Sequence, residues 1–188
     1  MNFRLFLLGL GNIGDEYKNT RHNVAWIIFD MLAGNDWTEN KYAKAFLAND
    51  VSGGSDVLFI KPTTFMNNSG DVLPFLIKEH QLSAESLVVV HDDIDLPLGT
   101  IRISYDRGDG GHNGIKSIVG VLESKAFLRI RIGVSLLDEN TILRKPDVLG
   151  SFSKDEMEKI KKDIAPTVGK VIESLIVNGK EKTMGKFN

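Results

Sequence analysis

The chain has 188 residues, a formal net charge of −2 and no cysteine. The lack of cysteine excludes a disulfide framework and any thiolate nucleophile or metal ligand. The charge balance argues against a broadly basic nucleic-acid binder, although it leaves room for a local basic patch. A chain of this length buries roughly 70 % of the surface that it exposes when unfolded, so we expect a single domain over residues 1–188. Its apolar runs are too short to span a bilayer, and we expect a cytoplasmic protein.

Six apolar runs typical of β-strands alternate with segments of helical periodicity. The runs cover residues 4–10, 45–51, 56–62, 86–92, 100–105 and 128–134, and the sequence SGGS between the second and third is a hairpin signal. Apolar residues recur at helical spacing over residues 24–32, 72–77 and 115–122. A last helix, rich in lysine and glutamate, begins near Ser153, where SKDE matches a capping box.

This alternation predicts an α/β fold, a three-layer α/β/α sandwich in which helices cover both faces of a twisted β-sheet. The hairpin makes the sheet mixed rather than purely parallel. Ligands of such sheets bind in a crevice at the carboxyl ends of the strands. Residues 136–150 have the least regular pattern, and we expect a surface loop or lid there.

The first strand runs into a glycine pattern that also occurs in dinucleotide-binding folds. Gly9, Gly11 and Gly14 match G-x-G-x-x-G, which in those folds places a pyrophosphate at a helix N-terminus. Here nine largely polar residues separate Gly14 from the helical pattern that starts at Val24, and no acidic residue ends the second strand. The glycines are therefore better explained as a tight turn that presents Asn12 and lets a ligand approach the backbone.

Four polar, glycine-containing clusters follow four of the predicted strands. They read GLGNIGDEYKNTRHN, KPTTFMNNSG, HDDIDLPLG and DRGDGGHNG. Because each comes directly after a strand, we expect them to line one shared crevice.

A histidine and a group of carboxylates are the chemically active candidates in these clusters. His22 stands just before the first helix, and a general base needs a pKa near neutrality and an acceptor that fixes its tautomer. Asp92 supplies such an acceptor. Together with His91, Asp93 and Asp95 it could equally form a metal site for Mg, Mn or Zn. The residues alone leave these two interpretations open.

Asparagines recur in the same clusters. Asn12, Asn67 or Asn68, and Asn113 each lie in a turn-prone segment, where asparagine is also an ordinary capping residue. Amides donate and accept without charge, which suits them to orient a water or to stabilise an oxyanion. A histidine base surrounded by amides fits hydrolysis of an ester or amide better than it fits redox chemistry.

Taken together, the four clusters resemble the bacterial-type peptidyl-tRNA hydrolase family. The family's blocks appear in order and at its spacing, as GLGN-G--Y--TRHN, KP-TFMN-SG, HDD-DLP-G and G-GGHNG--S. A later R-RIG and a VLG-F before the last helix also match, so the resemblance covers essentially the whole chain. It implies an α/β/α fold and hydrolysis of the ester that links a peptidyl group to the terminal ribose of tRNA. It further implies no metal, no cofactor, no obligate protein partner and a monomer.

The resemblance also assigns roles to individual residues. It implies that His22 is the base that activates water, that Asp92 orients it, and that Asn12 lies on the oxyanion side. The residues that it implies for substrate binding are Tyr17, Phe65, Asn67 and Asn113. Those that it implies for contact with the tRNA phosphates near the acceptor stem and 3′ end are Arg131, Arg102 and Lys116.

Two positions depart from the family pattern. Ile13 stands where a proline is usual, so the turn after Asn12 lacks that restraint on φ and must be held by packing. Ser104 stands where many members carry a lysine or arginine for the tRNA phosphate. The nearby cations that could compensate are Arg102, Arg107 and Lys116.

Overall fold

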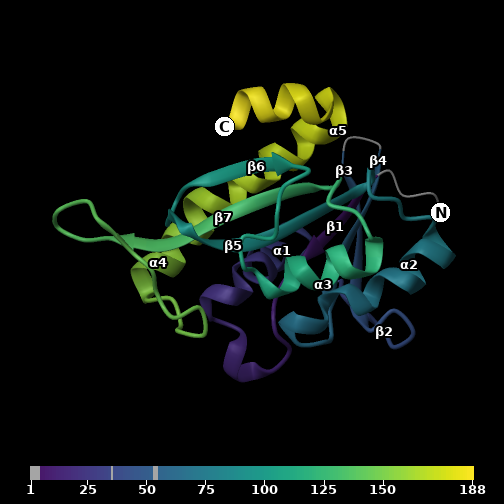
Figure 1. Cartoon of the computed structure of the whole chain (residues 1–188), viewed down its shortest axis with the longest axis horizontal. Helices are drawn as coiled ribbons and strands as arrows, with labels where there is room; N and C mark the ends of the chain where they lie inside the picture. The colour runs from purple at the N-terminus through teal and green to yellow at the C-terminus, as the bar shows by residue number, and fades with distance from the viewer. Residues whose placement is uncertain (1–4, 35, 53–54) are drawn as a thin grey trace.

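The computed structural model describes residues 5–34, 36–52 and 55–188. Its centre is a mixed sheet in the order β2-β3-β4-β1-β5-β7-β6, with β8 paired to β7 (Figure 1). The strands are β1 (Leu5–Gly9), β2 (Thr38–Asn40), β3 (Ala45–Ser52), β4 (Ser55–Pro62), β5 (Leu87–Pro97), β6 (Ile101–Tyr105), β7 (Leu128–Leu137) and β8 (Leu143–Arg144). Strands β4, β1, β5 and β7 run parallel, while β2, β3, β6 and β8 pair antiparallel to their neighbours.

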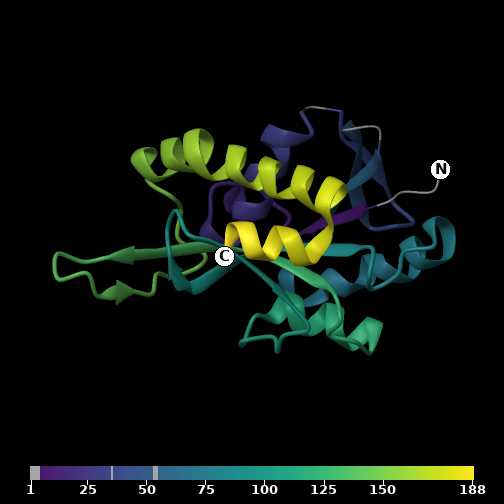
Figure 2. The same ribbon diagram turned by 90° about the horizontal axis from the view of Figure 1, so that it is seen from above.

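Helices cover both faces of this sheet, as the three-layer prediction requires (Figure 2). One face packs against α1 (Val24–Leu32), α4 (Lys154–Lys159) and α5 (Ala165–Phe187), and the other against α2 (Leu73–His80) and α3 (Asn113–Leu122). Successive strand residues point to opposite faces. In β1, Leu7 therefore joins the core under α1 and α5, whereas Phe6 and Leu8 join the core under α2 and α3.

The ends of two helices follow directly from the sequence. Ser153 Oγ accepts from the Glu156 backbone N–H at 3.3 Å, and the Ser153 N–H donates to the Glu156 carboxylate at 2.7 Å, which confirms the capping box. The first helix begins only at Val24, after short 3₁₀ turns at Asp15–Tyr17 and Arg21–Asn23. That late start confirms that the glycine turn does not open directly into a helix.

The remaining strand and hairpin predictions agree closely with the structure. Strands β3 and β4 pair antiparallel along their whole length, as the hairpin signal requires. Arg4, Gly53 and Gly54, which belong to the predicted first strand and turn, lie outside the described residues. Within the described residues, no helix is both long and apolar enough to cross a membrane.

Three predictions about element boundaries were wrong or incomplete. Strand β5 continues through the HDDIDLP sequence to Pro97, with a register irregularity after Asp93, so this cluster lies on a strand rather than after one. Residues 136–150 are not wholly a loop, because β7 extends to Leu137 and pairs with β8 in a hairpin that projects from the body (Figures 1 and 2). The short strand β2 was not predicted.

Candidate active site

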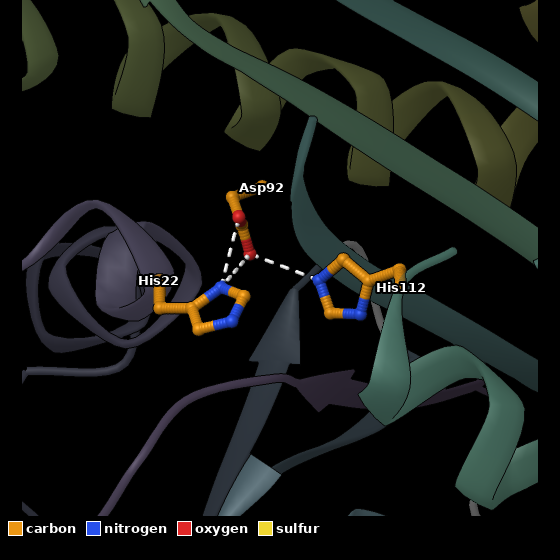
Figure 3. A group of neighbouring side chains, drawn as sticks. All are labelled: His22, Asp92 and His112. Atoms are coloured by element: carbon orange, nitrogen blue, oxygen red, sulfur yellow. Dashed lines mark hydrogen bonds and ion pairs between the residues drawn. The ribbon is translucent and has the colours of Figure 1, made fainter. Parts of the chain in front are cut away.

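A histidine and an aspartate from distant parts of the chain form the centre of the site. His22 lies in the 3₁₀ turn that precedes α1, and Asp92 lies on β5 at the carboxyl side of the parallel strands. His22 Nδ1 is 2.9 Å from each carboxylate oxygen of Asp92, whose side chain is 2 % exposed (Figure 3). The predicted pairing of base and carboxylate is therefore present in the geometry.

A second histidine, for which the sequence alone indicated no role, completes the centre. His112 Nε2 lies 3.0 Å from Asp92 Oδ1, on the other side of the carboxylate from His22 (Figure 3). The two imidazole rings have their centroids 5.3 Å apart. The only signal in the sequence was the position of His112 inside the GGHNG cluster beside Asn113, and a histidine before a helix is commonplace.

The two imidazoles determine the charge of Asp92. Burial alone would raise the pKa of this carboxyl, but the hydrogen bonds from His112 and His22 outweigh it and hold the pKa below its ordinary value. Asp92 is therefore a carboxylate at neutral pH and can only accept hydrogen bonds. The nitrogens that face it, His22 Nδ1 and His112 Nε2, must both carry a proton.

The other members of the HDDID sequence are dispersed rather than gathered around an ion. Burial and the neighbouring His112 lower the pKa of His91 to about 3, and its Nδ1 lies 2.7 Å from the backbone oxygen of Asp92. Asp93 pairs with Arg131 at 2.6 Å and Asp95 with Lys145 at 2.6 Å. The cluster whose potential ligand atoms do gather, all within 4.8 Å of one another, consists of His22, Asp92 and His112. Imidazole and carboxylate are ligand types that bind zinc, but here both imidazoles already form hydrogen bonds to the Asp92 carboxylate.

Asn12 is held in the turn by hydrogen bonds to the side chain of Asn23. The buried Asn23 accepts from the Asn12 N–H and donates to the Asn12 carbonyl, both at 2.9 Å. The Asn12 side-chain oxygen accepts from the Met66 N–H at 2.8 Å, which fixes the orientation of the amide. Asn12 Nδ2 has no hydrogen-bond partner among the described residues and remains available as a donor. The turn, which has Ile13 where a proline is usual, is therefore held by hydrogen bonds from the Asn23 side chain to the Asn12 backbone and not by packing alone, as was expected.

The glycines before Asn12 allow the turn to pack closely on α1. A Cβ atom on Gly9 would lie 2.7 Å from the Phe29 ring, and one on Gly11 would lie 2.7 Å from Trp26 Nε1. Trp26 Nε1 also donates to the Gly9 carbonyl at 3.0 Å. These glycines are therefore required by the contact between turn and helix, which supports the interpretation of the sequence as a tight turn.

The backbone of His22 is held by the segment that follows the β7–β8 hairpin. The His22 N–H donates to the Val148 carbonyl at 2.9 Å, and the Arg21 N–H donates to the Gly150 carbonyl at 3.1 Å. The Arg21 guanidinium, which is nearly buried, donates to the Val134 carbonyl at 3.0 Å and pairs with Glu156 at 2.7 Å. Glu156, the acidic member of the capping box of α4, therefore also helps to place the turn that carries His22.

A cavity of about 230 Å³ lies beside the three central residues. It is lined by His22, Asp92 and His112, by the loop 107–111, and by Asn113, Arg129 and Arg131. The prediction that this loop follows a strand at the carboxyl edge of the sheet was wrong. Strand β6 is antiparallel to β7 and ends at Tyr105, opposite Leu128. Residues 106–112 must cross back along the sheet before His112 reaches Asp92.

A family model described as peptidyl-tRNA hydrolase matches residues 6–188 of the chain. The chain belongs to the peptidyl-tRNA hydrolase family. It is 40% identical over 186 residues to the peptidyl-tRNA hydrolase of Bdellovibrio bacteriovorus, with 97% of this chain and 98% of the relative covered. It is also 40% identical over 185 residues to that of Fervidobacterium nodosum, covering 98% and 96% of the two chains. The crystal structure of peptidyl-tRNA hydrolase from Acinetobacter baumannii superposes with a TM-score of 0.84 at 27% identity, covering 100% of this chain and 96% of that one.

Membership of the peptidyl-tRNA hydrolase family confirms the resemblance that the four motifs suggested, and makes the chain an esterase. The structural match confirms the α/β fold. Among the residues that the resemblance singled out, His22, Asp92, Asn113 and Arg131 line the same cavity. Asn12 does not line this cavity, but its backbone is bonded to Asn23, the residue that follows His22.

The other predicted residues of this peptidyl-tRNA hydrolase family member lie outside that cavity. Tyr17 and Phe65 meet edge to face with ring centroids 6.4 Å apart, and Phe65 is 57% exposed. Asn67 is exposed in the 3₁₀ segment Met66–Val72, next to the residue that bonds to Asn12. Arg102 on β6 and Lys116 on α3 are exposed and do not line the cavity.

Proposed function

We propose that the chain hydrolyses the ester of peptidyl-tRNA with His22 as the general base. The observation that carries this proposal is the Asp92 carboxylate between two imidazoles. Because Asp92 accepts from His22 Nδ1–H, the other nitrogen of His22, Nε2, bears a lone pair and can take a proton from water. Asp92 then stabilises the imidazolium that forms.

The reaction follows in two proton-coupled steps. His22 Nε2 removes a proton from water, and the water oxygen attacks the ester carbonyl carbon to give a tetrahedral intermediate with a negative oxygen. That intermediate breaks its bond to the ribose oxygen, which takes the proton back from His22. The products are the free peptide carboxylic acid and tRNA with a restored ribose hydroxyl.

Asn12 is the residue we assign to the oxyanion. Its Oδ1 is occupied by the Met66 N–H, so the amide presents Nδ2 as a donor with a fixed direction. A preorganised donor of this kind is worth about 10²–10³ in rate when it points at the developing charge. The buried pair with Asn23 supplies the rigidity that this role requires.

Four residues are proposed to hold the acyl and ribose parts of the substrate. Asn113 stands at the first turn of α3, exposed beside the cavity, where its amide can bond to a peptide backbone. Tyr17 and Phe65 offer an aromatic pair from two separate loops, which suits stacking of a base or ribose at the 3′ end. Asn67 follows Met66 and can orient the water or the ester carbonyl.

The phosphate contacts proposed for Arg131, Arg102 and Lys116 differ in their surroundings. Arg131 is largely buried and already paired with Asp93, so a phosphate would share its guanidinium with that carboxylate. Arg102 and Lys116 are exposed, and each can contribute a salt-dependent attraction. Because a peptidyl-tRNA is made wherever ribosomes translate, we expect the protein to act in the cytoplasm, and as a monomer.

Hydrolysis of N-acetyl-aminoacyl-tRNA by the purified protein tests this proposal. We expect wild type to release the acyl group with or without a chelator, and His22→Ala to lose at least about 10²-fold in kcat. Activity that chelator removes and divalent metal restores would instead assign the site to metal chemistry. Near-normal turnover by His22→Ala would show that another group is the base.

A further inference from the structure

The loop that delivers His112 to the active site is connected to the rest of the protein in an unusual way. Residues 106–111 cross from the end of β6 to the start of α3. Within this loop Asp106, Gly110 and Gly111 have positive φ angles of 48°, 61° and 81°. Its internal bonds are few: the Asp109 side chain accepts from the Gly111 N–H at 2.8 Å, and the Asp109 carbonyl accepts from the His112 N–H at 3.0 Å.

One buried side chain supplies the loop's attachment to the sheet. Arg129 on β7 donates from Nη1 to the Gly108 carbonyl at 2.7 Å and from Nη2 to the Arg107 carbonyl. In the described part of the chain, these are the only hydrogen bonds that join residues 106–111 to another segment. The planar guanidinium presents its donors in a rigid fork, so two consecutive carbonyls are held at once.

Arg129 is an expensive residue to bury for stability alone. It is 2 % exposed, packs with its guanidinium carbon 4.7 Å from the centre of the Phe127 ring, and has no carboxylate within ion-pairing distance among the described residues. Burial lowers the pKa of its guanidinium, an effect that Asp109 opposes. An apolar side chain of similar volume would pack on Phe127 without this desolvation cost.

The consequence of the attachment is felt at the catalytic carboxylate. Immediately after the loop, His112 donates to Asp92 at 3.0 Å and packs its ring against that of His91, with centroids 4.7 Å apart. Asn113 follows and lines the cavity. A loop released from Arg129 would leave both residues on a tether whose remaining bonds are local.

We propose that Arg129 is a positioning residue of the hydrolysis, which holds residues 106–111 against the sheet so that His112 reaches Asp92 and Asn113 faces the substrate. This inference rests on the proposed function, and it adds a role to a residue that does not itself contact the reacting atoms. It distinguishes Arg129 from Arg131 two residues later, whose guanidinium pairs with Asp93 and not with the loop.

A double-mutant cycle with His112 tests the proposal. Arg129→Met keeps a side chain on Phe127 but removes the donors that hold the loop. We expect kcat/KM for N-acetyl-aminoacyl-tRNA to fall about 10- to 100-fold, which is the effect of losing the one hydrogen bond from His112 to the charged Asp92. In a His112→Ala background the same change should cost clearly less than it does in wild type, because the contact of His112 with Asp92 is already gone and only the placement of Asn113 can still be lost. Arg129→Lys, which keeps the charge but replaces the planar fork by one ammonium group, should lie between wild type and Arg129→Met.

Lys61→Met serves as the matched control. Lys61 on β4 is also a buried cation on an aromatic ring, 3.9 Å from the centre of Trp37, and it pairs with Asp30 rather than with the loop. We expect Lys61→Met to lower the Tm and to combine additively with His112→Ala. If Arg129→Met also combines additively, or leaves kcat/KM unchanged while lowering the Tm, Arg129 is merely structural and the proposal is overturned.

Two further readouts keep the result interpretable. If Arg129→Met does not fold, the cycle is run with Arg129→Lys and the same criterion applies. Backbone hydrogen exchange at Gly111 and His112 is measured in wild type and Arg129→Lys, and we expect exchange to be at least about tenfold faster in the variant. Unchanged exchange would refute the attachment. Because exchange does not depend on substrate, it separates a failure of this inference from a failure of the proposed function.

Discussion

Asp92→Asn is the substitution that examines the catalytic centre most directly. The carboxylate accepts from His22 Nδ1 at 2.9 Å and from His112 Nε2 at 3.0 Å. A carboxamide has one acceptor oxygen, and because His22 Nδ1 lies 2.9 Å from both carboxylate oxygens, the NH₂ group of asparagine faces the His22 N–H in either orientation of the amide. One imidazole must then rotate or move its proton. If His22 changes tautomer, the nitrogen that should accept a proton from water already carries one.

The magnitude follows from the bonds that are lost. A hydrogen bond to a charged group contributes about 1.5–3 kcal/mol, which corresponds to roughly 10- to 150-fold in rate if it is felt fully in the transition state. In serine proteases, where the equivalent exchange also produces the wrong tautomer, the loss in kcat reaches about 10⁴. We therefore expect Asp92→Asn to lower kcat by at least about tenfold and by as much as about 10⁴-fold, with a smaller change in KM.

The assay is steady-state hydrolysis of N-acetyl-aminoacyl-tRNA across pH, with circular dichroism to show that the variant is folded. Asp95→Asn is the matched control, because Asp95 is an exposed aspartate of the same strand that pairs with Lys145 away from the two imidazoles. We expect this control to keep wild-type kcat. A folded Asp92→Asn protein with kcat within about threefold of wild type would refute the assignment of Asp92 as the group that orients His22.

Three other outcomes are expected. Asn23→Ala removes both bonds to the Asn12 backbone and should cost about 1–3 kcal/mol in the free energy of unfolding, measured by urea denaturation, together with a fall in kcat; unchanged kcat would mean that Asn12 needs no such support. Asn113→Ala should raise KM more than it lowers kcat, as initial rates over a range of tRNA concentrations will show; a pure kcat effect would contradict its binding role. The pKa of His91 is lowered to about 3 in the fold from about 6.5 when unfolded. Between these two pH values the unfolded state binds one more proton than the folded state. The contribution of His91 to the free energy of unfolding is therefore fully present above about pH 6.5 and falls by about 1.4 kcal/mol per pH unit below it. His91→Gln should flatten that slope in urea titrations from pH 7 to 4, and an unaltered slope would exclude His91 as its source.

Much of the architecture could be predicted from the sequence because it depends on local patterns. The apolar runs marked the inner strands to within a few residues, since a strand buried on both faces must be continuously apolar. The capping box at Ser153 and the late start of the helix at Val24 are likewise local properties. His22 and Asp92 were identified by the chemistry of their residue types and by family motifs.

Long-range contacts decided the rest of the site. Whether residues 93–97 lie on a strand or in a turn depends on the pairing of β5 with β7, which continues the strand through a polar sequence. The direction of β6 depends on the same neighbour, and it determines that the loop after it must return along the sheet before His112 can contact Asp92. No local pattern encodes such a path.

The turn that begins the chain's first motif shows the same division. The sequence by itself determined that Asn12 stands on a glycine turn at the end of β1 and that Ile13 cannot supply the restraint of a proline. Only the tertiary structure showed that the side chain of Asn23 holds the Asn12 backbone, through two hydrogen bonds. The physical reason is that a sequence specifies which groups can donate and accept, whereas their partners are chosen by the packing of segments that the chain brings together from a distance.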